Sequence, residues 1–342
     1  MRRIAIIIMI SVTGITRLSS QVGGDNTYEF LNLSTSALIT ALGGINVSLP
    51  VDDPSISLYN PALLYGSPKN NFTLNYVNYF AGINYGSATW SGEHEKAGKF
   101  AVGIVYLNYG NFEEADQSGN ITGEFRASEY AMNLTWNLHI DTLFNAGINF
   151  KPVLSQLEGY TSFGIAFDLG MTYTSLNGII NAGLVVSNIG LQLTRYTEKK
   201  ERLPTSITAG ITASPQHAPF RISVTAHHLT RYDLTHSYTD VDSEQESNSS
   251  GIAAFGENIM RHIVIGAEFI PSPNFFISAG FNYQRRKELA VDYRSSTVGF
   301  STGFGLRLAA FDLTYSRSRF HLAGAVNNIS LMVKPGAFIK RN

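Results

Sequence analysis

The sequence contains no cysteine, and only 15% of its 342 residues are charged. The absence of cysteine excludes disulfide scaffolds, thiol catalysis and cysteine metal sites. The charged fraction is low for a soluble surface, on which about 25% is usual. The net charge of -1 gives no reason to propose a nucleic acid as a partner. Beyond residue 20 no window approaches about 18 uninterrupted apolar residues, so no spanning helix is expected.

The chain is rich in glycine and aromatic residues, with 31 Gly, 21 Phe and 17 Tyr, which suits many short strands. In the stretch SEYAMNLTWNLHI, residues 128–140, every second residue from Tyr130 to Ile140 is apolar. Successive side chains of a strand point to opposite faces. This stretch therefore predicts one strand with an apolar face and a polar face.

The same alternation recurs in about 14 segments of roughly 9–15 residues, which is close to the length that a tilted membrane strand needs. Helical periodicity hardly competes with it. The expected segments are 72–80, 83–92, 98–109, 124–139, 142–156, 159–175, 178–190, 203–214, 219–231, 260–270, 274–284, 294–309, 311–320 and 323–333.

The lengths of the links between these segments, numbered in chain order, alternate along the chain. Even-to-odd links are short, whereas several odd-to-even links are long, among them GNFEEADQSGNITG at 110–123 and a polar stretch from Tyr232 to Ile259. Alternate links of an up-and-down barrel lie at the same end, and outer-membrane barrels carry their long loops outside. A soluble sandwich has no reason to sort its loops in this way. The sequence therefore predicts an all-β fold, a transmembrane outer-membrane β-barrel of about 14 antiparallel strands.

In such a barrel the polar face lines the lumen and the apolar face meets lipid. Most lumen residues are small or uncharged, and the charged exceptions are Lys151, Asp168, Arg221, Glu268 and Arg307. Aromatic residues near the segment ends suit girdles at the membrane interfaces, with ordinary barrel packing as the alternative. These residues are Tyr76, Tyr79, Phe80, Tyr106, Tyr109 and Tyr173.

Four regions are expected along the chain. Residues 1–20, with the basic start MRR and the apolar run IAIIIMISVTGI, are typical of a signal peptide, and an uncleaved anchor is the alternative. Residues 21–70 do not alternate and are expected to form a plug, because unpaired backbone groups cost several kcal/mol each in lipid. We expect this plug inside the barrel or over its periplasmic mouth. The barrel spans 71–334, and 335–342 form a tail.

The expected plug contains two turn motifs. Asp52 and Asp53 precede Pro54, and a solvated turn is favoured there over an acid/base or calcium site. Asn60 can cap a short helix that begins at Pro61, where the missing N–H of proline is harmless.

The blocks ALGG, DDPS and NPALL in this region resemble the N-terminal signature of the FadL-like outer-membrane barrels, which include PorV. Longer blocks, such as GGDNTYEFLNLSTSALITALGG and APFRISVTAHHLTRYDL, are similar to the PorQ family of the type IX secretion system. The resemblance implies a 14-stranded barrel with an N-terminal plug. It also implies association with PorZ, and with PorU and PorV, in an attachment complex at the cell surface. It leaves contact with lipopolysaccharide open.

Candidate enzymatic residues do not combine into a site. Ser301 lies in GFSTG, which matches a nucleophile elbow, but an alternating strand is the better interpretation of its surroundings. His227 and His228 are adjacent on an expected strand, so they should point to opposite faces and cannot share a metal. We expect no enzyme, no cofactor and no metal site.

Three functions stay open at this point: a non-catalytic component of the type IX apparatus, a FadL-like channel for a hydrophobic solute, and a lipid hydrolase that would rest on Ser301 alone. For the first, the flanks of the acidic stretch DVDSEQESNSS supply aromatic and arginine residues, the types that dominate protein interfaces. The predicted partner-binding rim consists of His228, Arg231, Tyr232, Tyr238 and Phe255, and a solvated loop without a partner is the alternative.

Overall fold

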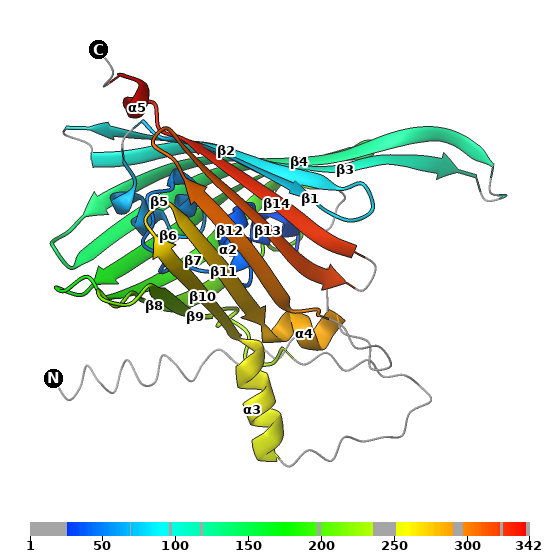
Figure 1. The fold of residues 1–342 in the computed structure, drawn as a ribbon. Helices are drawn as coiled ribbons and strands as arrows, with labels where there is room; N and C mark the ends of the chain where they lie inside the picture. The colour runs from blue at the N-terminus through cyan, green and yellow to red at the C-terminus, as the bar shows by residue number, and fades with distance from the viewer. Residues whose placement is uncertain are drawn as a thin grey trace, which may run out of the picture.

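A closed antiparallel β-barrel makes up most of the protein (Figure 1). The computed structural model describes residues 26–68, 70–95, 98–116, 118, 120–196, 200–234, 251–289, 297–321 and 324–339, so the expected signal peptide lies outside the described residues. The strands are β1 (Phe72–Asn78), β2 (Asn84–His94), β3 (Gly98–Ala115), β4 (Ile121–His139), β5 (Phe144–Leu157), β6 (Tyr160–Thr174), β7 (Ile180–Thr194), β8 (Ser206–Ala213), β9 (Phe220–Ala226), β10 (Ile263–Ser272), β11 (Phe275–Asn282), β12 (Phe300–Arg307), β13 (Phe311–His321) and β14 (Gly324–Val333).

Each strand pairs with its neighbours in the sequence, and the ring closes where β1 pairs with β14, with Phe72 opposite Val333. The predicted fold, an all-β barrel of about 14 antiparallel strands, is confirmed within the described residues. Closure leaves no strand edge unpaired along the membrane-spanning part of the sheet, as a bilayer requires.

The apolar side chains of the alternating strands point outward and the polar side chains point inward, as the sequence predicts. On β4 the side chains of Met132 and Trp136 are 44% and 52% exposed, whereas Asn133 and Thr135 are each 3% exposed. An exposed apolar side chain on every second position of a closed barrel forms an outward band suited to lipid.

None of the helices within the described ranges is long and apolar enough to cross a membrane.

Five of the six aromatic residues expected at the interfaces divide into two groups, and the sixth, Tyr173, is partly exposed. Tyr76, Phe80 and Tyr106 are exposed on the outside of the barrel. Tyr79 and Tyr109 instead pack against a buried apolar cluster inside it, so the girdle prediction is wrong for these two residues.

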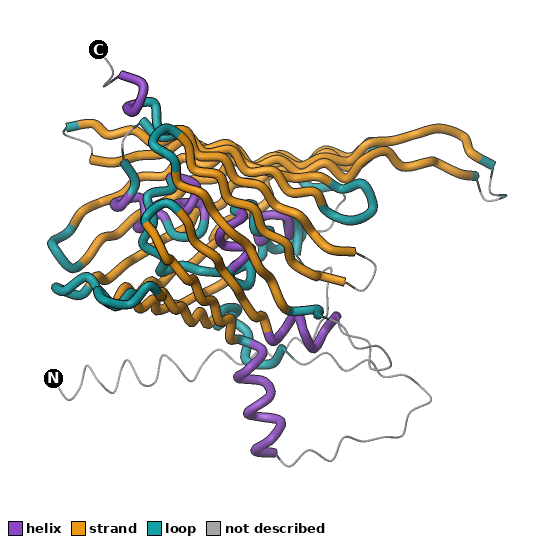
Figure 2. Tube along the Cα trace, in the orientation of Figure 1, coloured by secondary structure: helices purple, strands orange, loops and turns teal. Residues whose placement is uncertain are grey.

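The largest departure from the expected strands is a hairpin that projects from the barrel (Figure 2). Strands β3 and β4 continue to pair from Gly110 opposite Ala127 to Ala115 opposite Ile121, so the loop predicted over 110–123 is wrong. Both faces of this ribbon are largely exposed, and the alternation that marks the barrel strands is absent from it. We call residues 109–126 the β3–β4 arm.

Helices interrupt the strand pattern in places where the sequence predicted none. Helix α3 (Gly251–Arg261) lies in the expected polar link, α4 (Tyr283–Leu289) replaces the expected end of one strand, and α5 (Gly336–Ile339) lies in the expected tail. Ion pairs stabilise the first two. Glu257 of α3 pairs with Arg261 one turn later at 3.0 Å and with Lys287 of α4 at 3.3 Å. The apolar residues of α3 do recur at helical spacing, at Ile252, Phe255 and Ile259, but the helix lies in a link that the strand alternation marked only as polar.

Residues 26–68, which we call the N-terminal segment, lie inside the barrel (Figure 1). The segment contains η1 (Glu29–Asn32), α2 (Ala37–Ala41), η2 (Pro54–Leu58) and η3 (Pro61–Gly66). It begins at the mouth that carries the odd-to-even links (the loop mouth), where Asn26 bridges to Arg202. It ends at the opposite turn mouth, where Lys99 Nζ donates to the carbonyl oxygen of Ser67 at 2.8 Å.

Two apolar clusters fill the interior around this segment. One combines Tyr28 and Phe30 with wall residues such as Val77 and Val153, and the other combines Ile39, Leu42, Leu49 and Ile56 with Phe276. The lumen is therefore occupied by the chain's own apolar residues along much of its length.

A closed barrel with an outward apolar band should behave as an integral membrane protein. We expect the protein to remain with the outer-membrane fraction in high salt and to migrate faster on a gel before boiling than after it, because the closed sheet resists detergent. Release into the soluble fraction by salt alone would contradict the placement of the apolar band in lipid.

Candidate functional site

The two turn motifs of the N-terminal segment cap its short helices. Asp53 precedes η2 and accepts hydrogen bonds from Ser55 N at 2.8 Å and from Thr73 Oγ1 of β1 at 2.9 Å. Asn60 precedes η3, accepts from Ala62 N at 3.0 Å and donates to Val47 O at 2.7 Å. Pro54 and Pro61 begin the two helices, where a missing N–H is harmless. Asp52 is exposed.

Close packing against the wall depends on glycine. A Cβ atom at Gly170 of β6 would overlap Asn60 Oδ1, and one at Gly183 of β7 would overlap Val47 O. Only glycine therefore allows the backbone of the segment to approach these strands so closely. Small lumen residues are predicted from the alternation, but their role as contacts for the N-terminal segment is not.

Four of the five charged lumen residues come together as two ion pairs. At the turn mouth Arg221 makes two hydrogen bonds to the carboxylate of Glu268, at 2.6 and 2.8 Å. Arg221 also donates to Pro50 O of the N-terminal segment at 3.3 Å. The guanidinium of Arg307 lies 4.9 Å from the ring centre of Phe276.

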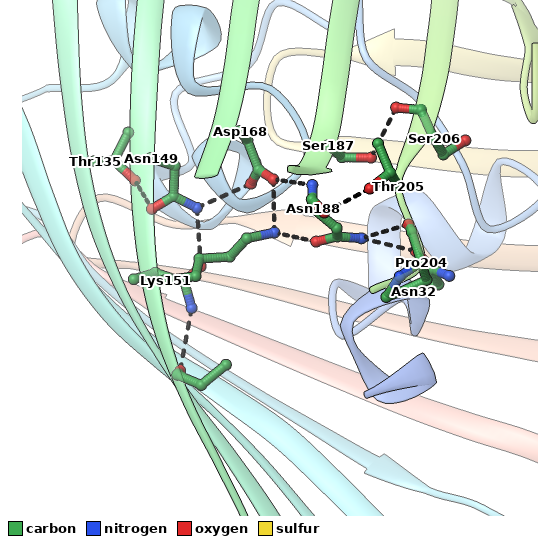
Figure 3. A network of polar contacts seen from close by, with 12 residues as sticks. Asn32, Thr135, Asn149, Lys151, Asp168, Ser187, Asn188, Pro204, Thr205 and Ser206 are labelled. Carbon is green, nitrogen blue, oxygen red and sulfur yellow. Dashed lines mark hydrogen bonds and ion pairs between the residues drawn. The ribbon is translucent and has the colours of Figure 1, made fainter. Parts of the chain in front are cut away.

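A second pair lies at the centre of a buried polar network (Figure 3). Lys151 Nζ lies 2.7 Å from Asp168 Oδ1, and both side chains are almost fully buried. Asp168 also accepts from the backbone N–H of Asn188 at 2.8 Å and from Asn149 Nδ2 at 3.1 Å. Thr135 then donates to Asn149 at 3.2 Å. The buried charges are thus paired and hydrogen-bonded, as stable burial requires.

Asn188 connects this network to the rest of the molecule (Figure 3). Its φ of 58° places it in the left-handed region, beside a register irregularity between β6 and β7. Its side chain accepts from Lys151 Nζ and donates to Asn32 Oδ1 at 3.1 Å and to Pro204 O at 3.2 Å. The barrel wall, the N-terminal segment and the β7–β8 link therefore meet at one side chain.

The predicted rim is only partly assembled. Tyr232 and Phe255 are 71% and 52% exposed, and their ring centres lie 6.5 Å apart. Arg231 is exposed beside them, whereas His228 is half-buried. Tyr238 lies outside the described residues.

The prediction that His227 and His228 point to opposite faces is wrong. Strand β9 ends at Ala226, and His228 has a φ of 54°, which turns the chain. Both rings line the same cavity, with their centres 4.8 Å apart. Burial lowers the pKa of His227 to about 3, with the positive charge of Arg285 among the further causes. The described residues hold no cluster of three side chains that could bind a metal.

The β3–β4 arm adds a second exposed feature at the loop mouth. The rings of Phe112 and Phe125 stack across its two strands at 5.1 Å, and Ile121 is 63% exposed. A two-stranded ribbon with few apolar neighbours is marginally stable in water.

Ser301 lies on strand β12 and is 2% exposed. Its hydroxyl donates to Ala41 O at 2.9 Å, so it is a contact between the barrel wall and the N-terminal segment. The strand–turn–helix geometry of a nucleophile elbow is not formed around it.

Solved structures of toluene transporters have a similar arrangement. The crystal structure of the Ralstonia pickettii toluene transporter TbuX aligns with a TM-score of 0.52 at 11% sequence identity, over 89% of this chain and 98% of that chain. The P. putida toluene transporter TodX aligns with a TM-score of 0.50 at 12% identity, over 88% of this chain and 97% of that chain. A TodX deltaS2 mutant, described as a monoaromatic hydrocarbon channel, gives a TM-score of 0.52 at 13% identity, over 88% and 98% of the two chains.

At such low identity these alignments show the fold alone. The chain has the fold of the FadL-like outer-membrane barrels, and the structures it resembles are transporters and channels rather than enzymes. No protein-family model and no curated protein matches the sequence.

The buried ion pair provides a test of the network. We expect Lys151→Met to lower the free energy of unfolding by about 3–5 kcal/mol, because Asp168 keeps a buried charge without its counter-ion. A double variant that also carries Asp168→Leu should recover part of this loss. Denaturant unfolding in lipid vesicles measures both.

The pair of Lys334 and Asp312 is a suitable control, since it is only partly buried and its atoms lie 2.6 Å apart. We expect Lys334→Met to cost less than about 1 kcal/mol, as partly exposed pairs usually do. Equal losses in the two single variants would show that the Lys151 network has no special importance for stability.

Proposed function

We propose that this chain is a non-catalytic outer-membrane barrel, exported by residues 1–20 as a signal peptide, that tethers a cell-surface attachment complex of the type IX secretion system. The observation that carries the proposal is the contrast between the exposed features at the loop mouth and the filled interior of the barrel. The β3–β4 arm and the Tyr232–Phe255 pair project at the loop mouth, while the N-terminal segment occupies the interior through buried contacts. The resemblance of several long sequence blocks to the PorQ family supports the same role.

The exposed features suit a protein partner. Tyrosine, arginine and other large side chains dominate binding energy at interfaces, and Tyr232, Arg231 and Phe255 present such groups together. The β3–β4 arm would gain stability when a partner covers it, because its stacked aromatic pair has little other protection. By resemblance the direct partner is PorZ, with PorU and PorV as the other members of the complex.

The double variant Tyr232→Ala with Phe255→Ala tests the docking surface. We expect it to insert and fold as a barrel but to lose PorZ on co-purification from solubilised outer membrane, because two exposed anchors are removed while no buried contact changes.

A matched control truncates two exposed apolar residues at the turn mouth, Ile140 and Leu176, which are 53% and 89% exposed. The control variant, with alanine at both positions, should keep PorZ. Retention of PorZ by the Tyr232 and Phe255 variant would mean that this part of the rim is not the docking surface.

A second candidate function is a channel for a small hydrophobic solute. Its support is the fold shared with TbuX and TodX over most of this chain. In this case the N-terminal segment would have to move for solute to pass, because it occupies the lumen from one mouth to the other.

A reversible crosslink separates the two functions. Ser48 Oγ of the N-terminal segment lies 2.8 Å from Thr212 Oγ1 of β8, and the native chain has no cysteine to interfere. A double variant with Ser48→Cys and Thr212→Cys should therefore form a disulfide that locks the segment to the wall.

Under oxidising conditions we expect the locked variant to deliver secreted proteins to the cell surface as well as the wild type does. Secretion that fails when the lock closes and returns with a reductant would contradict the tethering role. Loss of toluene uptake on locking, with secretion intact, would assign the channel function instead.

A further inference from the structure

Two arginines lie on the lipid-facing surface of β13. Arg317 and Arg319 are exposed, whereas Ser316 and Ser318 are buried toward the lumen, so both arginine side chains point outward. Nearer the turn mouth the same outward face carries Leu313, which is 41% exposed. A charged side chain on the lipid face of a barrel is unfavourable unless it reaches the headgroup region. The two arginines therefore call for an explanation.

The pairing of β12, β13 and β14 places these arginines at a boundary on the outer surface. Three large side chains form one outward row across the strands: Phe304, Tyr315 and Ile329. The next row toward the loop mouth is polar and consists of Thr302, Arg317 and Asn327. Tyr315 connects the two rows, because its hydroxyl donates to Asn327 Oδ1 at 2.8 Å. An aromatic ring whose polar end is turned away from the apolar band is typical of a membrane interface.

Neither guanidinium group is neutralised within the part of the chain that the structure describes. Arg221 of β9, by comparison, forms an ion pair with Glu268 at 2.6 Å. The side chains of Arg317 and Arg319 have no ion pair and no hydrogen bond among the described residues. Residues two positions apart on a strand share a face and lie roughly 7 Å from each other. The two arginines therefore form a pair of neighbouring positive charges without a counter-ion.

The chemistry of this pair and of its surroundings points to an amphipathic phosphate. Arginine presents its N–H groups in a planar fork that matches the oxygens of a phosphate. Apolar surface lies directly beside the charges, since Phe300 and Phe304 of β12 are 54% and 42% exposed on either side of Thr302. A ligand with a phosphate and an apolar part satisfies both surfaces, whereas a free anion leaves the two rings uncovered.

We propose that Arg317 and Arg319 bind the phosphate headgroup of an anionic lipid in the leaflet at the loop mouth. The phosphate accepts hydrogen bonds from the two guanidinium groups, and the acyl chains cover Phe300 and Phe304. The proposed docking surface is separate, because Tyr232 lies in the link between β9 and β10 and Phe255 lies on α3. Loss of the lipid site would therefore leave the docking surface intact.

Native mass spectrometry of the full-length protein in detergent tests the proposal. The protein is titrated with phosphatidylglycerol or with phosphatidylcholine of the same acyl chains. We expect the first phosphatidylglycerol to bind roughly tenfold more tightly than the first phosphatidylcholine, because the choline group of the latter neutralises its own phosphate. An excess of inorganic phosphate should not displace phosphatidylglycerol, since it has no chains to cover the two phenylalanine rings.

The double variant Arg317→Gln with Arg319→Gln removes both positive charges. It should bind the two lipids about equally, while its heat-modifiable migration on gels stays that of the wild type. The matched control is Arg126→Gln with Arg202→Gln, which removes two exposed arginines at the same mouth, one on the β3–β4 arm and one in the β7–β8 link. The control variant should keep the preference for phosphatidylglycerol.

The proposal is overturned if the wild type does not prefer phosphatidylglycerol, or if the preference survives in the variant that lacks Arg317 and Arg319. An equal loss in the control variant also overturns it, because net charge rather than this site would then explain the preference. Displacement of the lipid by inorganic phosphate would show that the two arginines bind a soluble anion and would overturn the assignment to a lipid.

Discussion

The hydrocarbon interior of a membrane offers no water to the peptide backbone, so a strand that crosses it must find partners for its N–H and C=O groups on other strands. The pairing of β1 with β14 meets this demand by closing the ring. Closure separates an outside, where apolar side chains meet lipid, from an inside that is sheltered from it. The inward side chains then need partners of their own, and the N-terminal segment provides them through contacts such as Ser48 with Thr212 and Ala41 with Ser301.

A part of the fold could be predicted from sequence where successive residues meet regularly alternating surroundings. The barrel strands could be located because lipid on one side imposes the same two-residue period at every strand, as in residues 128–140. The β3–β4 arm carries no such pattern because its two faces are both largely exposed. Helix α3 lies in a link that the strand alternation left unassigned, and α4 consists mostly of polar and charged residues, which leave no apolar period.

The candidate sites were less accessible to prediction because they depend on contacts between distant parts of the chain. Gly170 and Gly183 looked like ordinary small lumen residues, and only the position of Asn60 and Val47 shows why no larger residue fits. His227 was placed on a strand by the alternation, but β9 ends one residue earlier and the left-handed backbone at His228 turns both rings to one cavity. Charged lumen residues such as Lys151 could be identified from the sequence, although their pairing across strands could not be predicted. The exposed pair of Tyr232 and Phe255 was suggested by residue type, and α3 is the element that brings the two rings near each other.

The position of helix α2 has a consequence for assembly. The backbone N–H of Ala37 donates to Ser330 Oγ on β14, a contact between residues 293 positions apart, and Asn328 Nδ2 donates to Thr40 Oγ1 across a similar separation. The N-terminal segment is synthesised before β14, so it obtains these partners only after β14 has been made. Until then the segment has an incomplete site to bind, and loop-closure entropy opposes its docking. Completion of the sheet and docking of the N-terminal segment are therefore coupled, and both occur late in folding. A truncated chain that lacks β14 would expose an open sheet edge and leave the N-terminal segment undocked.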